Sequence, residues 1–379
     1  MMKIRLNQDI TIILIMIVVT VILFFIPTGF EDNYNKSIRS KALVISVDNS
    51  QLEQRGIVKT GVQQVKVRIL QGEFKGKEFN STNNLKGQLE LDKMFSVGDK
   101  ALVVIDHQGD EVVFVNIIDH YRINIEAILF FIFILILIAF AGITGVKTVI
   151  SFIFTILAIW KILIPSFLKG YDPIVISLII TTIIMAVTIY LVGGLNKKSL
   201  VAFLGAFIGM VATCILSLFF GKEFNLHGAV VPFSETLLYS GYGNLNITRI
   251  FLAGIFIASS GALMDVAMDI SAAVYEIVSI NPKIHMSKAI KSGFSVSRAV
   301  IGTMATTLLL AYSGGYTAML MVFMAQGTPV INILNMTYVS AEILHTLVGS
   351  FGLVLVAPAT SILSGLMFTR KSKKVTYNS

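Results

Sequence analysis

The sequence predicts an α-helical polytopic membrane protein with about eight transmembrane helices and a small extracytoplasmic β-barrel-like domain. Of its 379 residues, 55% are hydrophobic and 14% are charged, and the mean hydropathy is +0.80. A soluble domain carries about 25% charged residues. About eight apolar runs approach the roughly 20 residues that a transmembrane helix needs. A polar, strand-like segment separates the first run from the others.

The first element, residues 1–30, is predicted to be an N-terminal signal-anchor helix. Lys3 and Arg5 precede an apolar run from Ile10 to Ile26. A cleavable signal peptide is the alternative, but no Ala-x-Ala-like site follows the run. We therefore expect the helix to remain in the protein, with its N-terminus in the cytoplasm.

Residues 31–122 are predicted to form the extracytoplasmic β-rich domain. Apolar and polar residues alternate in 42–47 and 65–70, and glycines recur at turn-like intervals. We expect an OB-like or SH3-like barrel that serves as a rigid cap or binds a protein partner. The segment holds 13 basic and 13 acidic residues, and few aromatic residues lie among them. A nucleic-acid partner is therefore not expected, although the whole chain has a net charge of +8.

Residues 123–379 are predicted to form a multi-helix membrane domain. The expected spans lie near 125–145, 148–166, 174–193, 199–220, 247–270, 296–314 and 342–368. Residues 316–335 are interrupted by Gln326 and Pro329, and they either span or re-enter the membrane. Thirteen basic residues fall on the proposed inner side and four on the outer side, leaving the β-rich segment aside. This bias predicts that both termini are cytoplasmic.

Two aspartates inside the run near residue 265 are the main candidates for chemistry. Asp265 and Asp269 are four residues apart, so they share one face of a helix, and Glu276 lies two turns further on. An uncompensated carboxylate near the bilayer centre costs roughly 3 kcal/mol. Their predicted use is a proton or cation relay facing the bundle interior. Solvated carboxylates, or ion pairs with Lys283 or Arg298, are the alternatives.

Further candidates lie on the neighbouring predicted spans. Ser259, Ser260, Thr306 and Thr307 offer hydroxyls that could line a path, although packing alone also explains such residues. Glu342 and His345, at i and i+3, suggest an outer gate or an interfacial pair. The segment 281–296 is basic and suggests an amphipathic element on the inner surface or a solvated loop.

Several classes of site are not expected. Cys214 is the single cysteine, and the five histidines show no ligand-spaced pair, so we expect neither a disulfide framework nor a metal site. The sequence contains no phosphate-binding Gly-x-x-x-x-Gly-Lys-Ser/Thr loop and no His-Glu-x-x-His motif. An intramembrane aspartyl protease would need a Gly-x-Gly-Asp pattern, which is also missing. We therefore expect no enzyme activity and no cofactor.

The string Ser-Ser-Gly-Ala-Leu-Met-Asp-Val-Ala-Met-Asp-Ile-Ser-Ala-Ala-Val-Tyr-Glu, residues 259–276, resembles the signature of the YibE/F family of bacterial membrane proteins. Gly-Thr-Met-Ala-Thr-Thr-Leu at 302–308 and Tyr-Ser-Gly-Gly at 312–315 resemble it as well. The resemblance spans roughly 125–370. It implies a permease-like protein of the bacterial cytoplasmic membrane, without an agreed substrate.

The order of one span, an external domain and then an aspartate-bearing helix is also similar to SecF and the wider RND group. In that group an intramembrane aspartate couples proton flow to work, which by likeness implies Asp265 or Asp269 as the coupling acid. This chain has about two additional spans before that helix and a shorter external domain.

The expected function is therefore proton- or cation-coupled transport of an unknown small solute or ion across the bilayer. Asp265 and Asp269 would exchange the ion, and Glu276 would pass protons to the cytoplasm. The competing prediction is a non-transporting scaffold or envelope assembly factor whose β-domain binds a partner. The sequence does not predict an oligomeric state.

Overall fold

The computed structural model describes residues 2–30, 37–109 and 111–369, with side chains from Ile10 onward. The chain divides into two compact units, one formed by Met1–Thr28 with Ala141–Ser379 and the other by Gly29–Phe140. Composition alone placed boundaries at residues 30 and 122. The structural units instead group the first helix with the later helices, and most of the helix after residue 122 with the strands.

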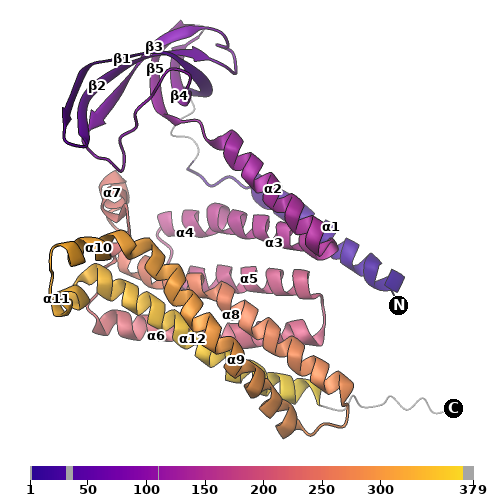
Figure 1. The fold of residues 1–379 in the computed structure, drawn as a ribbon. Helices are drawn as coiled ribbons and strands as arrows, with labels where there is room; N and C mark the ends of the chain where they lie inside the picture. Colours follow the sequence, from indigo (N-terminus) through magenta and orange to yellow (C-terminus); the bar gives the residue numbers. More distant parts are fainter. Residues whose placement is uncertain (1, 31–36, 110, 370–379) are drawn as a thin grey trace. The chain divides into compact units, whose positions relative to one another are not determined.

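The unit Gly29–Phe140 contains an antiparallel five-stranded sheet among its described residues, with strand order β3-β2-β1-β4-β5 (Figure 1). The strands are β1 (Ser37–Arg55), β2 (Val58–Ile69), β3 (Glu78–Lys86), β4 (Lys100–Gln108) and β5 (Glu111–His120). The Ile117 amide of β5 donates to Ser81 Oγ of β3 over 2.9 Å. The two edge strands therefore approach each other, and the sheet nearly closes. The predicted barrel-like domain is confirmed.

A buried glutamine fixes the long connection between β3 and β4. Gln63 is fully buried, and its Nε2 donates to Asn49 Oδ1 over 2.9 Å and to the Phe95 carbonyl over 3.0 Å. Its Oε1 accepts from the Phe95 amide over 3.1 Å and from Asn83 Nδ2 over 3.0 Å. Because every polar group of this amide has a partner, its burial is compatible with a stable core.

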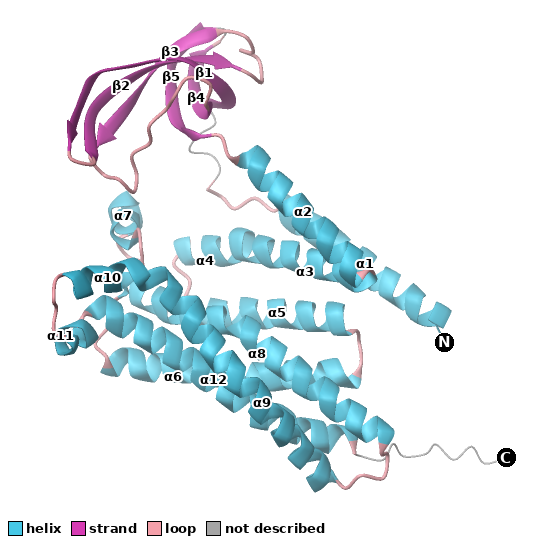
Figure 2. Ribbon diagram, in the orientation of Figure 1, coloured by secondary structure: helices cyan, strands magenta, loops and turns pink. Residues whose placement is uncertain are grey.

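Helix α2 (Ile123–Ala141) follows β5 (Figure 2). Nineteen residues at about 1.5 Å each give a length near 28 Å, close to the hydrocarbon thickness of a bilayer. None of its residues is buried within the described structure. A helix of this length that is apolar on all sides is suited to span a membrane.

The second unit is helical. Its main helices are α1 (Met2–Phe25), α3 (Ile143–Ala158), α4 (Ile164–Leu168), α5 (Pro173–Gly193), α6 (Lys197–Glu223), α8 (Ile247–Ile280), α9 (Met286–Ser313), α10 (Thr317–Ala325), α11 (Val330–Asn335) and α12 (Thr337–Phe368). A π-helical turn at Ile159–Leu163 joins α3 to α4, and the short helix α7 (Ser234–Leu237) precedes α8.

Polar residues set the starts of the longer helices. Asp172, Asn196 and Asn246 cap α5, α6 and α8, and each side chain accepts a hydrogen bond from a backbone amide of the first turn. His285 caps α9 in the same way. Such caps satisfy amides that would otherwise lack a partner, at about 1 kcal/mol each.

Helices α6, α8 and α12 form the centre of this unit, with α5 and α9 against them (Figure 1). Phe256 and Leu263 of α8 and Val356 of α12 are fully buried between these helices. Glycines bring α6 and α12 close together: a Cβ at Gly352 would meet the Thr213 hydroxyl, and one at Gly205 would meet Thr360. Small residues allow this close approach of helix backbones in membrane proteins.

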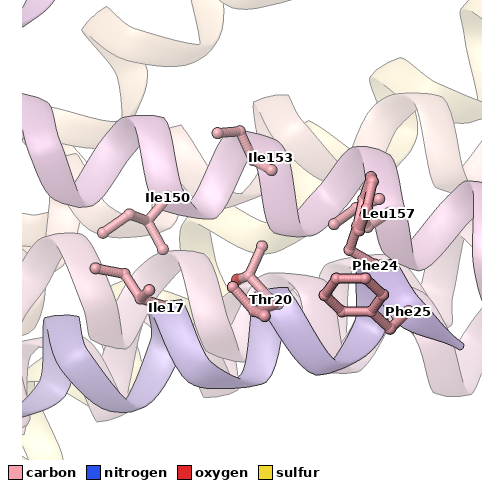
Figure 3. Close-up of a pocket in the computed structure, with 8 residues that line it drawn as sticks. Ile17, Thr20, Phe24, Phe25, Ile150, Ile153 and Leu157 are labelled. Atoms are coloured by element: carbon pink, nitrogen blue, oxygen red, sulfur yellow. The ribbon is translucent and has the colours of Figure 1, made fainter.

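Helix α1 packs on α3 through Leu23, which is buried with Phe154. Beside this contact is an apolar groove of ≈ 320 Å³, shown in Figure 3. Thr20 is the one polar side chain along it, and its hydroxyl donates to the Met16 carbonyl over 2.6 Å. The groove therefore offers no free polar group.

Seven helices in the described part of the chain are long and apolar enough to span a membrane, and the first helix adds a shorter apolar stretch, Ile10–Phe25. The prediction of about eight helices is confirmed. One expected segment differs: residues 286–296 are the first turns of α9, continuous with the span, and not a separate surface element. Beyond α9, a 3-10 turn at Gly314–Tyr316 leads to the short helix α10, and α11 precedes α12.

Candidate functional site

Two contacts join α8 to its neighbours α5 and α6. Near its start, Arg249 Nη2 lies 2.6 Å from Asp172 Oδ2, which joins the beginnings of α8 and α5. Further on, Ser271 Oγ donates to the Lys198 carbonyl at the beginning of α6 over 2.8 Å. The two positions are about 22 residues apart, or roughly 33 Å. This length is comparable to the hydrocarbon core of a bilayer, about 30 Å, so the stretch of α8 between the two contacts is long enough to cross one.

Asp265 lies inside this interval, six residues or about 9 Å from the Ser271 end. Asp269 lies about 3 Å from the same end, and Glu276 lies beyond it. Tyr275 lies beside Lys198, whose ammonium is 5.2 Å from the ring centroid, as is common for residues at a membrane interface.

Asp265 and Asp269 lie on the outer face of the single-chain bundle, where both are exposed. Ala258, Ala272 and Glu276 are exposed on the same side of α8. The expectation that the carboxylates face the bundle interior is therefore wrong for the single chain. The reason is that apolar residues such as Leu263 and Ile270 occupy the opposite face of α8, where they are fully buried against the other helices.

The outer face of α8 differs from the other spans. Exposed large apolar residues cover the outer faces of α5, with Ile179 and Ile183, and of α12, with Leu347 and Phe351. Along α8 no exposed large apolar side chain precedes Tyr275 within the described structure. This face consists of small residues and carboxylates, a composition poorly suited to lipid.

Neither aspartate is paired within the chain. Among the residues that the structure describes, no hydrogen bond or salt bridge involves the carboxylate of Asp265 or Asp269. In particular, no ion pair joins them to Lys283 or Arg298. The two carboxylates are therefore open to an ion or to a partner from outside the chain.

Ser259 and Ser260 lie on a different face of α8 from the two aspartates. Ser259 is fully buried and Ser260 is 7% exposed, and their hydroxyls donate to the carbonyls of Phe256 and Ile257. A Cβ at Gly349 of α12 would lie 3.4 Å from Ser259 Cβ. Both serines thus face the helix packing, on the opposite side of α8 from Asp265, and the structure does not place them on one path with the carboxylates.

The threonines are exposed on α9. Thr306 Oγ1 lies 3.5 Å from the Gly302 carbonyl, and Thr307 Oγ1 lies 3.0 Å from the Thr303 carbonyl. Each hydroxyl therefore satisfies the backbone of its own helix, as threonines in membrane helices do. In the described chain neither contacts Asp265 or Asp269 by a hydrogen bond.

A second polar cluster lies toward the Arg249 end of the bundle. Glu342 and His345 are in the second and third turns of α12, and the His345 ring stacks on Tyr312 of α9, with centroids 4.2 Å apart and an interplanar angle of 27°. Tyr316 and Glu342 line the same pocket. The sequence had indicated Glu342 and His345 but not the tyrosines. Tyr312 and Tyr316, at i and i+4, were the available signal.

The clearest electrostatic interaction lies at the start of α8, where Arg249 meets Asp172. The Arg249 guanidinium hydrogen-bonds the Asp172 carboxylate and holds its pKa below the ordinary value of 3.8, and the Val175 and Ile174 amides act in the same direction, while partial burial opposes them. Within the described ranges, no group of three or more His, Cys, Asp or Glu side chains could hold a metal ion.

Comparison with known proteins agrees with this architecture. A family model described as YibE/F-like protein matches residues 129–370, and one described as YibE/F family N-terminal domain matches residues 35–120. No curated protein and no solved structure matches the chain. The first match covers the helices that carry both polar clusters, and the second covers the strands. The chain therefore belongs to the YibE/F family.

Proposed function

We propose that this protein is a proton- or cation-coupled permease of the bacterial cytoplasmic membrane, with both termini in the cytoplasm and the β-domain outside. The observation that carries the proposal is the pair Asp265 and Asp269 on an unpartnered face of α8, within the stretch that is long enough to cross a bilayer. Placing charges there is costly, at roughly 3 kcal/mol per carboxylate. Reversible protonation or cation binding removes that charge and gives the pair a role in coupling.

In this proposal the ion reaches Asp265 and Asp269 from the end marked by Lys198 and Tyr275. This is the cytoplasmic end, because Lys197 and Lys198 stand at the turn between α5 and α6 and the basic residues favour that side. Glu276, exposed and about two turns beyond Asp269, attracts cations to this entrance. Neutralising the aspartates lets the outer face of α8 move against an apolar environment.

Flux measurements test the proposal. We would reconstitute the full chain in vesicles containing a pH-sensitive dye, impose a potassium diffusion potential and record proton movement with and without sodium. Wild-type protein should accelerate the ion movement, and Asp265→Asn should reduce the rate at least tenfold. Glu235→Gln, an exposed acid on α7, is the matched control. Equal rates for wild type and Asp265→Asn would refute the role of the aspartate.

A second candidate is a scaffold whose β-domain binds a protein partner. The observation that favours it is the exposure of apolar residues on β5, where Val113 is 64% and Phe114 is 48% exposed. Neighbouring residues of a strand point to opposite faces, so both faces of this edge strand present apolar surface. Deletion of residues 31–122 separates the candidates: a scaffold loses all activity, whereas a permease retains ion flux.

A further inference from the structure

The cluster on α9 and α12 contains an unusual concentration of unpartnered polar atoms. Six buried side-chain atoms in the described chain lack a hydrogen-bond partner, and three of them are Tyr312 Oη, Glu342 Oε1 and His345 Nε2. The stack of Tyr312 on His345 places two of these residues in direct contact. Buried polar groups are normally satisfied, so a group of three without partners indicates that something outside the chain completes them.

A cavity of ≈ 240 Å³ adjoins this cluster. Its walls come from the end of α9, from α10 and from α12, and they are mainly apolar, with Leu309, Leu320 and Val339 among them. Glu342 and Tyr316 are the ionisable residues along it. The volume is slightly below the range of about 300–1,000 Å³ that is usual for drug-sized ligands, so the cavity suits a small molecule.

The charge and the aromatic ring in the cavity favour a positively charged ligand. Glu342 supplies a carboxylate with one unpartnered oxygen, and no lysine or arginine lines the described cavity to neutralise it. Tyr316 adds an aromatic face, which attracts cations. A bare metal ion would need several oxygen ligands, whereas most of these walls are hydrocarbon. A charged amine attached to an apolar body satisfies both parts of the cavity.

We propose that this cavity binds a small organic cation, with its ammonium group on Glu342 and Tyr316 and its apolar body against α9, α10 and α12. Tyr312 and His345 belong to the neighbouring cluster and are not among the residues that line the cavity. The inference rests on the proposed function in one respect, since it names the class of solute that the permease would carry. The site is separate from the aspartates, because Glu342 and Asp265 are roughly 20 Å apart along the helix axes.

Equilibrium dialysis of the purified full chain tests the site. The probe is radiolabelled phenethylammonium, and 2-phenylethanol is its neutral counterpart of similar size. Wild-type protein should bind the cation at least tenfold more tightly than the alcohol. Glu342→Gln should abolish that preference without weakening binding of the alcohol. Leu320→Trp, which fills the cavity, should weaken both, and the control Glu235→Gln should change neither.

Three results would overturn the site: no binding of the cation to wild-type protein, equal binding of cation and alcohol, or undiminished cation binding to Glu342→Gln. Thermal unfolding and gel filtration of each variant establish that it is folded. Dialysis with Asp265→Asn separates this inference from the proposed function, since it should bind the cation as wild type does. If Asp265→Asn loses flux but still binds the cation, both the proposed function and the cavity site are supported. If wild-type protein shows coupled flux but does not bind the cation, only the cavity site is contradicted.

Discussion

Arg249 Nη2 and Asp172 Oδ2 are 2.6 Å apart, and this pair ties the beginning of α8 to the beginning of α5. Asp172 also caps α5, accepting hydrogen bonds of 3.0 Å from the amides of Ile174 and Val175. One carboxylate therefore holds two helix starts. Because α8 carries both aspartates of the candidate site, this pair helps to fix the position of that helix against α5.

Substitution of Asp172 separates its two roles. Asp172→Asn retains a capping side chain but loses the charge, and should lower stability by about 0.5 kcal/mol, since exposed ion pairs contribute about 0–1 kcal/mol. Asp172→Ala loses the cap as well, and should cost about 1–2 kcal/mol in total. Thermal unfolding in detergent measures the difference. Equal effects of the two variants would show that the cap contributes nothing.

The same pair predicts a pH dependence. Arg249 lowers the pKa of Asp172 in the folded protein below the ordinary value of 3.8. The stabilisation is therefore fully present above the unfolded pKa, and it disappears as the pH falls through the lowered one. Wild type should lose its stability advantage over Asp172→Asn only below about pH 4. An advantage that disappears already between pH 7 and pH 5 contradicts this assignment.

Packing between α6 and α12 predicts a contrast between two glycines. A Cβ at Gly352 would strike the Thr213 side chain, whereas one at Gly302 on α9 would meet no atom within 4 Å. Gly352→Ala should destabilise the protein by about 1–3 kcal/mol through overpacking. Gly302→Ala should be neutral or stabilising by up to about 1 kcal/mol, because alanine favours helix. Similar melting temperatures for the two variants would count against the close packing.

The buried amide of the β-domain gives a local prediction. Gln63→Ala removes the acceptor of the Phe95 amide and of Asn83 Nδ2, and should cost about 1–3 kcal/mol. Hydrogen exchange on the full chain should show faster exchange of the Phe95 amide. Gln88→Ala, with an exposed side chain, is the control. Unchanged protection of Phe95 in Gln63→Ala would show that Gln63 does not hold the β3–β4 connection.

Much of the fold follows from local sequence pattern. Apolar runs predict the spans, and the alternation of apolar and polar residues predicts strands β1 and β2. The motif around Asp265 indicates the family. The start of α9 was missed because basic residues such as Lys288 and Lys291 obscured the continuity of the helix with the span. Strand order also depends on pairing between distant residues, which no local pattern determines.

The candidate site was predicted in part. Spacing placed Asp265 and Asp269 on one face of a helix, but it could not say which face the neighbouring helices would cover. That choice depends on Leu263 and Ile270, which pack against other helices on the opposite side. The stacking of Tyr312 on His345 joins residues 33 positions apart in the sequence, and their contact depends on how α9 and α12 cross.

The most direct measurement is chemical labelling of the two aspartates. A hydrophobic carbodiimide reacts with protonated carboxyl groups in an apolar environment, and mass spectrometry maps each site. Purified protein should be labelled at Asp265 or Asp269 near pH 7. Glu276, which is exposed about two turns beyond Asp269, is the internal control and should not be labelled. Suppression by sodium would identify a cation as the coupling ion. The labelling is repeated over a series of pH values. Absence of labelling at both aspartates at every pH would contradict a coupling role for them.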